Sequence, residues 1–339
     1  MNKFYILFFI LLIAVQAKSQ DVHFSQFYNT PGIMNPAQTG QYRLVKRVII
    51  NYRNQWASVP APYVTPMLYA DAAIYNCKLK GDHVGVGLTL LNDKSGNGNL
   101  NTFHTKASFA YHKALDQNLK HQLSVGFQAE YYGKGFDPSK IVFQNQYQDN
   151  SFNNSISSGE SFANESFNRF DFNAGVAWTS NFSKNNSFYL GGAMHHLARP
   201  FEGFSGVGQR LGMRYVASGG GQISLNDKFS ISPSFMYATQ TKASELNAGL
   251  ALGYHTTQNT GRDNMASFYI GTWYRLKDAV IIFSGIDYQK IRFSFSYDIN
   301  TSGLKSASLG NGGFELSLAY ILFGKECRKK YNTTFCPRF

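Results

Sequence analysis

Apolar and polar residues alternate with a period of two along most of this chain, from Arg43 to Phe323. In the stretch 291–299, for example, Ile, Phe and Tyr at every second position alternate with Arg, Ser and Asp. A β-strand with this pattern has one apolar and one polar face, because successive side chains point to opposite sides. The pattern therefore predicts an all-β chain whose strands are apolar on one face only.

About 14 segments show this alternation, and most are near the ten residues that a tilted strand needs to cross a bilayer. An even number of antiparallel strands returns the chain to the side where it began, as in bacterial single-chain barrels. We therefore predict a single closed antiparallel transmembrane β-barrel over residues 43–323, as found in the outer membrane of Gram-negative bacteria. The expected strands are 43–53, 62–73, 83–92, 100–114, 121–133, 169–181, 186–197, 211–223, 228–239, 246–258, 264–275, 278–289, 291–300 and 312–323.

Composition supports a barrel over the other classes of β-protein and membrane protein. Charged residues make up 15% and aromatic residues 16% of the chain, and the mean hydropathy is -0.27. A helical membrane protein would have a clearly positive mean hydropathy, whereas a barrel has a polar interior face on every strand. A soluble β-sandwich protein of this length would carry more charge on its outer faces and linkers between its domains.

The net charge of +12 does not indicate a nucleic-acid partner. Lys and Arg are dispersed singly or in short clusters, whereas nucleic-acid binding needs a concentrated basic patch. Anionic outer-membrane lipid or an acidic partner explains the excess better.

The two ends of the chain depart from the strand pattern. Residues 1–20 combine Lys3, an apolar run over 4–15 and small residues at 17 and 19, so they form a predicted signal peptide with cleavage near Ser19. Residues 21–42 contain several aromatic residues and two prolines, and we expect this segment to pack into the periplasmic mouth or the lumen as a plug. The basic segment 324–339 is an expected periplasmic tail and a candidate docking element; a tail tied by a disulfide and without a partner is the alternative.

The lengths of the connections predict the orientation of the barrel. Those after even-numbered strands are mostly short, whereas those after odd-numbered strands include 134–168, 198–210 and 301–311. Outer-membrane barrels have short periplasmic turns and longer external loops. We therefore expect both termini in the periplasm and 134–168 as the largest surface loop.

Few residues suggest chemistry. The chain lacks nucleotide-binding and zinc-protease motifs, and we predict no catalytic residue, no cofactor and no metal site. The neighbouring His195 and His196 are expected as one hydrogen-bonded lumen histidine and one interfacial histidine, since no further ligand lies at metal spacing. In the oxidising periplasm, Cys327 and Cys336 are a candidate disulfide, and Cys77 is the rival partner for either of them.

Several motifs resemble those of the PorP/SprF family. Residues 21–28 read DVHFSQFY, which is similar to the family's D-x-H-F-S-Q-[FY] opening. Further similarities follow in the family's order over most of the mature chain. They are NPAQTG at 35–40, NYRNQW at 51–56, FSYD at 295–298, GFELSL at 313–318 and CPRF at 336–339.

The resemblance implies an outer-membrane protein associated with the type IX secretion system of Bacteroidetes. Such a barrel helps the secretion or surface attachment of partner proteins, in some members large gliding-motility adhesins, and periplasmic secretion or anchoring components are also associated with the family. We expect these partners together with outer-membrane lipid. The residues in the matching motifs that we select as candidates for partner docking are His23, Phe24, Gln26, Asn35, Arg53, Gln55, Trp56, Tyr297 and Asp298.

The competing hypothesis is a passive channel or transporter for small hydrophobic or polar solutes. About 14 strands enclose a lumen wide enough for a solute if nothing fills it. Single-channel conductance separates the two hypotheses, because a stable open pore favours transport and silence favours a plugged scaffold.

Overall fold

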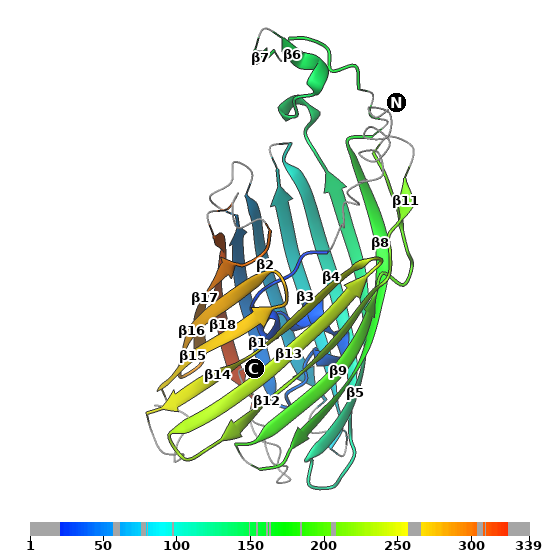
Figure 1. Cartoon of the computed structure of the whole chain (residues 1–339). Helices are drawn as coiled ribbons and strands as arrows, with labels where there is room; N and C mark the ends of the chain where they lie inside the picture. Colours follow the sequence, from blue (N-terminus) through cyan, green and yellow to red (C-terminus); the bar gives the residue numbers. More distant parts are fainter. Residues whose placement is uncertain are drawn as a thin grey trace, which may run out of the picture.

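The computed structural model describes residues 21–324, except 57–61, 76–78, 80, 97, 149, 154, 161, 163, 184, 205–207, 257–265, 304–307 and 309. Its main feature is a closed barrel of antiparallel strands (Figure 1). The barrel strands are β1 (Val45–Gln55), β2 (Tyr63–Ile74), β3 (His83–Ser95), β4 (Leu100–Ala114), β5 (His121–Gly135), β8 (Ser166–Asn181), β9 (Ser187–His195), β12 (Arg214–Ser224), β13 (Phe229–Gln240), β14 (Ala243–His255), β15 (Ala266–Arg275), β16 (Ala279–Tyr288), β17 (Ile291–Asn300) and β18 (Asn311–Phe323).

The predicted barrel and its strand number are confirmed. Each predicted segment matches one barrel strand, with boundaries that differ by a few residues. The barrel closes because β1 pairs with β18 over its whole length, from Val45 opposite Phe323 to Gln55 opposite Gly313. Two small hairpins were not predicted, since each strand has two residues: β6 (Tyr147–Gln148) with β7 (Ser151–Phe152), and β10 (Phe201–Glu202) with β11 (Gln209–Arg210).

The alternation of side chains sets the two faces of the wall. Large apolar side chains point outward, with Phe170 70% exposed and Ile270 65% exposed. Their neighbours Asp171 and Tyr269 point toward the lumen, where most buried polar side chains of the strands also lie. An apolar exterior around a polar interior is the arrangement that lipid outside and a hydrated or filled lumen inside require. In the described residues no helix is long and apolar enough to cross a membrane.

The two ends of the barrel differ in their connections. We call one end the long-loop mouth; it carries the longest described connections, 136–165 with β6 and β7, and 196–213 with β10 and β11 (top of Figure 1). The other end, the short-turn mouth, is where β1 begins and β18 ends. Its turns include 115–120, 225–228 and 289–290.

Residues Asp21–Leu44, which we call the lumen segment, run through the barrel (dark blue in Figure 1). The segment contains three short helices: η1 (Phe27–Asn29), α2 (Pro31–Met34) and η2 (Pro36–Gln38). All residues from 24 to 43 are buried except Tyr28 and Asn29, which are half-buried. The plug-like segment that its apolar composition predicted is therefore present inside the barrel wall.

The lumen segment enters at one mouth and leaves at the other. The Asp21 amide donates to Gln240 at the long-loop end of β13, whereas the Gly40 amide donates to Asp71 near the short-turn end of β2. Asp21 thus lies at the opposite mouth from Phe323, which corrects the expectation that the mature chain starts and ends at the same mouth. The strand pattern leads to the wrong expectation because it places only the start of β1, and 20 or so buried residues are long enough to cross the lumen.

Backbone of the lumen segment lies directly on two glycines of the wall. A Cβ atom at Gly85 would lie 1.8 Å from the Thr39 carbonyl oxygen, and one at Gly126 would lie 2.3 Å from the Pro36 carbonyl carbon. Neither approach leaves room for a side chain, because backbone on both sides has little freedom to move. These glycines set the distance between the segment and the wall.

Substitution of Gly126 by Ala should therefore destabilise the packed lumen. We expect the free energy of unfolding to fall by about 1–3 kcal/mol, the usual effect of overpacking a filled interior. The matched control is Gly303→Ala, since a Cβ at Gly303 would have no atom within 4 Å. Denaturant unfolding in detergent micelles measures both, and equal effects of the two substitutions would contradict the packing described.

Candidate functional site

Four buried charges hold the lumen segment near the long-loop mouth. Arg53 pairs with Glu315 and, at 3.1 Å, with Asp298, while Arg275 lies 2.7 Å from the same Asp298 carboxylate. Their side chains are at most 4% exposed. The Ser25 hydroxyl donates to Asp298 over 2.7 Å, and the Arg53 guanidinium donates to that hydroxyl over 2.7 Å. These four charged residues, which we call the four-charge cluster, carry two positive and two negative charges, and Arg275 also pairs with the more exposed Asp278 at 2.6 Å. The cluster ties the segment to four strands, β1, β15, β17 and β18.

The cluster brings together motifs from both ends of the sequence. Ser25 and Gln26 belong to the opening motif, Arg53 to the first strand, and Asp298 and Glu315 to the last two strands. The Gln26 backbone amide donates to Glu315 over 2.9 Å, so the opening motif contacts the seam where β18 pairs with β1 and the barrel closes. Glu315 lies in the GFELSL motif but was not among the candidate residues, and Arg275 lies in no motif. Neither spacing nor composition indicates which lumen charges meet.

The other selected residues are placed as follows. Phe24 packs in a buried apolar cluster with Ile33 and Met67, and the Asn35 side-chain amide donates to the carbonyl oxygens of Val176 and Gly192. His23 Nδ1 lies 3.8 Å from Glu245 in the lumen. The Gln55 side chain accepts from Arg53, the Trp56 ring contacts Tyr63 edge-on, and the Tyr297 hydroxyl donates to Asn311.

This placement separates internal from rim residues. Phe24, Gln26, Asn35, Arg53 and Asp298 are buried against the barrel's own side chains, so their contacts hold the segment in place. Gln55, Trp56 and Tyr297 are half-buried at the long-loop end of their strands. Partner docking by the selected residues stays a prediction. The signal peptide, the three cysteines and residues 325–339 lie outside the described residues.

A cavity of about 320 Å³ opens inside the long-loop mouth, and we call it the vestibule. Strands β3, β4 and β5 form its wall, and Val22 and Ile33 of the lumen segment also line it. Two ion pairs stand on the wall: Lys106 lies 3.1 Å from Glu130, and Lys134 lies 3.3 Å from Glu202 of β10. The vestibule is thus polar and reaches the N-terminal end of the lumen segment.

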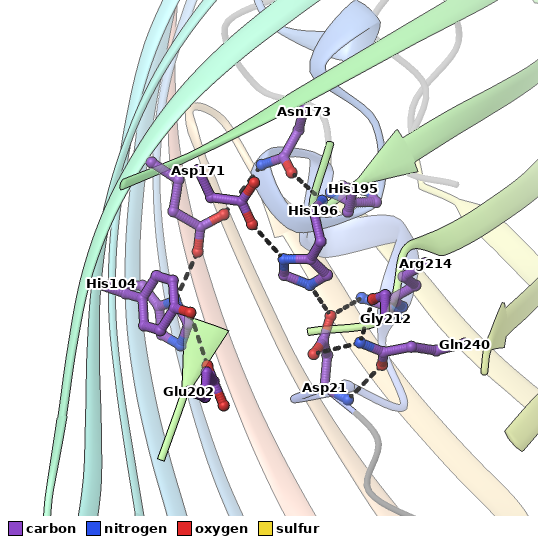
Figure 2. A network of polar contacts seen from close by, with 12 residues as sticks. Asp21, His104, Asp171, Asn173, His195, His196, Glu202, Gly212, Arg214 and Gln240 are labelled. Atoms are coloured by element: carbon purple, nitrogen blue, oxygen red, sulfur yellow. Dashed lines mark hydrogen bonds and ion pairs between the residues drawn. The ribbon is translucent and has the colours of Figure 1, made fainter. Parts of the chain in front are cut away.

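The lumen segment begins at a chain of polar contacts beside the vestibule (Figure 2). His196 lies between two carboxylates, with Nδ1 2.6 Å from Asp171 and Nε2 2.6 Å from Asp21. Both carboxylates accept only, so the ring donates at both nitrogens and is an imidazolium. The Gln240 amide donates to the Asp21 carboxylate over 3.2 Å, and Arg214 lies 3.9 Å from it.

Both neighbouring histidines are buried, which corrects the expected pair of one lumen and one interfacial histidine. His195 is the last residue of β9, and its Nε2 lies 3.3 Å from the Met34 carbonyl oxygen. His196 follows with a φ of 61°. The left-handed turn ends the alternation, so its side chain also turns inward. The alternation of side chains does not extend to His196, because β9 ends at His195.

The pKa of His196 depends on its two carboxylate partners. Burial alone would lower it, but the charge of Asp21 and the hydrogen bonds to Asp171 and Asp21 outweigh burial and raise the pKa to about 9. Because its pKa is about 9, His196 is charged at neutral pH, although the Arg214 guanidinium faces the same site.

This raised pKa predicts a loss of stability at alkaline pH. The contribution of a raised histidine pKa is fully present below the ordinary value of about 6.5 and is lost as pH rises through about 9. Wild type should exceed His196→Gln in thermal stability at about pH 6, and the difference should shrink by about pH 10. Heat-modifiable mobility on gels measures both proteins, and a constant difference across this range would contradict the ion pair.

The family model of the type IX secretion system membrane protein PorP/SprF matches residues 16–320. The chain belongs to this family. The resemblance predicted from the motifs is thus confirmed, and the match includes the lumen segment and all but the last three residues of the barrel of this PorP/SprF chain. A search among curated proteins gives no match.

A solved structure shows the same fold, and a second one is reported beside it. The toluene transporter TbuX of Ralstonia pickettii is 10% identical with a TM-score of 0.54, over 88% of this chain and 94% of that one. The monoaromatic hydrocarbon channel CymD is 12% identical over 88% and 93% of the chains, with a TM-score of 0.49. At this identity the likeness to TbuX shows the fold alone. The PorP/SprF chain is therefore an outer-membrane β-barrel of a secretion family, which is not a family of enzymes.

Proposed function

We propose that this PorP/SprF barrel is a plugged scaffold that binds a secreted or surface-anchored protein at its long-loop mouth. Its short-turn mouth would then dock periplasmic secretion or anchoring components. The observation that carries the proposal is the filled lumen, in which the segment is buried from residue 24 to residue 43. When the lumen of a barrel is filled by its own chain, the surfaces left for binding a partner are at its two mouths.

The long-loop mouth suits a surface partner. The 136–165 connection carries exposed apolar side chains at Val142, Tyr147 and Phe152. Below them, Phe136 packs edge-on against Phe162 and Phe204, which joins this connection to the 196–213 connection. Exposed aromatic side chains on a supported loop are typical of protein-binding surfaces. We place this mouth outside the cell, as the longer loops of outer-membrane barrels are.

Site-specific cross-linking tests the proposal. A photoreactive residue at Tyr147 should capture a secreted or surface protein in intact cells, whereas one at Lys228, in a turn of the other mouth, should capture periplasmic components. An epitope inserted beside Tyr147 should bind antibody without permeabilisation, and one beside Lys228 should not. Capture of no surface protein at Tyr147, or the opposite antibody pattern, would refute the proposal.

The periplasmic half has a separate test. Deletion of 324–339 should leave the heat-modifiable barrel intact and reduce the yield of periplasmic components captured at Lys228. An unchanged yield would remove the tail from that interaction.

The transporter alternative predicts a pore. The likeness to TbuX shows the barrel fold alone, and a segment inside the lumen does not by itself decide between the two functions. Single-channel conductance of the wild-type protein decides between the two functions.

A further inference from the structure

Asp21 lies in a site formed by His196, Arg214 and Gln240, which we call the receptor. Contacts within the barrel wall, and not Asp21, hold the His196 ring in place. Asp171 Oδ2 accepts from His196 Nδ1, its Oδ1 accepts from the Ala198 amide, and Asn173 accepts from the His196 amide. These contacts fix the imidazole ring so that Nε2 points into the mouth, where Asp21 lies (Figure 2). The orientation of the donors thus comes from β8 and the end of β9, not from Asp21.

The opposite side of the receptor comes from two other strands. The Gln240 side chain receives the Asp21 amide through its oxygen, and its nitrogen donates both to Asp21 and to the Gly212 carbonyl oxygen. Arg214, at the start of β12, lies 3.9 Å from the carboxylate. A carboxylate here therefore meets an imidazolium, a guanidinium and an amide at once, which is a typical anion receptor.

Burial distinguishes the receptor from its occupant. The side chains of His196 and Arg214 are 6% exposed and that of Asp171 is 0% exposed, whereas that of Asp21 is 26% exposed. Asp21, His196 and Arg214 all line the vestibule. A carboxylate that enters the vestibule therefore reaches the side chains of the receptor.

Charge favours an acidic occupant over a neutral or basic one. Without Asp21, the receptor keeps the Arg214 guanidinium and a His196 ring whose Nδ1 is held by Asp171, and the buried Glu245 lines a pocket together with Arg214 and Gln240. The two lysines that line the vestibule are already paired, Lys106 with Glu130 and Lys134 with Glu202. A carboxylate that enters the vacated site would restore the second partner of the His196 ring, and with it the raised pKa that keeps the ring charged.

We propose that His196, Arg214 and Gln240 form a carboxylate-binding site, that Asp21 occupies it in the resting protein, and that an acidic side chain of the surface partner exchanges with Asp21. The exchange rests on the proposed binding of a partner at the long-loop mouth. Its consequence is mechanical, because it frees the first residue of the lumen segment while Ser25 and Gln26 stay bound to the four-charge cluster. Partner binding would then release Asp21, at the start of the lumen segment, from the barrel wall.

Acetate tests the receptor by itself. In purified full-length protein in micelles, Asp21→Ala should bind acetate at least about tenfold more tightly than wild type, because a charge-assisted receptor is left open. The double variant Asp21→Ala with His196→Gln is the matched control and should bind no better than wild type. Line broadening of ¹³C-acetate measures binding, with chloride at the same ionic strength as the reference. Equal binding by the single and double variants would overturn the proposal.

The exchange with the partner needs a second measurement. With the cross-linker at Tyr147, Asp21→Ala should raise the cross-linked fraction of the surface protein, and His196→Gln should lower it. If wild type captures no surface protein, the proposed function fails. If wild type captures one and neither variant changes the fraction, the carboxylate exchange fails and the proposed function stands. Heat-modifiable mobility confirms that each variant is folded.

Discussion

Replacement of Arg53 by methionine is expected to lower the free energy of unfolding by about 3–5 kcal/mol, the usual loss when one partner of a buried ion pair is removed. Arg53 is 2% exposed and bridges Glu315, Asp298 and the Ser25 hydroxyl. Without it, Glu315 loses its ion-pair partner, and Asp298 keeps only Arg275, which also pairs with Asp278. A buried carboxylate without a counter-ion is unfavourable. The seam between β1 and β18 then loses the Arg53 contact with the Ser25 hydroxyl, while Glu315 still accepts from the Ser25 and Gln26 backbone amides.

Two further proteins make this prediction specific. Arg210→Met changes an exposed arginine near the same mouth and should alter stability by less than about 0.5 kcal/mol. Arg53→Met combined with Glu315→Gln restores a balanced charge and should recover part of the loss, so the two effects should not add. Guanidinium unfolding in micelles gives all three values. If Arg53→Met behaves like Arg210→Met, the four-charge cluster does not stabilise the barrel.

Deletion of residues 22–40 is expected to turn a silent protein into a pore. Small barrels of about 8 strands are filled by their own side chains, and those of about 16 leave an aqueous channel. A barrel of 14 strands lies near the upper end, and in this chain the lumen segment occupies the space. In planar bilayers, wild type should show no stable opening, and the deletion should raise the mean current at least about tenfold.

A deletion of equal length in a surface loop controls for this experiment. Removal of 141–159 shortens the 136–165 connection without touching the lumen, and this protein should remain silent. Heat-modifiable mobility must show that both deletion proteins are folded. Stable openings of wild type would support the transporter hypothesis, and a folded but silent Δ22–40 protein would show that another part of the chain closes the lumen.

The barrel and its membrane location follow from local sequence alone. Alternation is a property of neighbouring residues, and each hairpin pairs segments that are adjacent in the chain. Lipid demands that every backbone group in the wall be paired, so 14 half-apolar strands have few options besides closure. The strand ends from β1 to β18 were therefore predictable to within a few residues, and the family motifs were recognisable before any geometry was known.

The path of the lumen segment was decided only by the tertiary structure. Its apolar residues and prolines indicated that it packs against the barrel, but not that it crosses from one mouth to the other. The contacts that determine this path join Asp21 to Gln240 and Ser25 to Glu315, which are 219 and 290 residues apart. Local patterns contain no information about such pairs.

The same limit applies to both charged sites. Sequence motifs named Arg53 and Asp298, yet the balance of the cluster depends on Arg275, which lies in no motif. His196 looked like an ordinary strand residue, and its role depends on a left-handed turn and on the carboxylate of a residue 175 positions earlier in the chain. The sequence by itself determined the wall, because its two faces are read from neighbouring residues. Only the tertiary structure decided what fills the lumen, because the charges inside a closed barrel pair with residues that are distant in the chain.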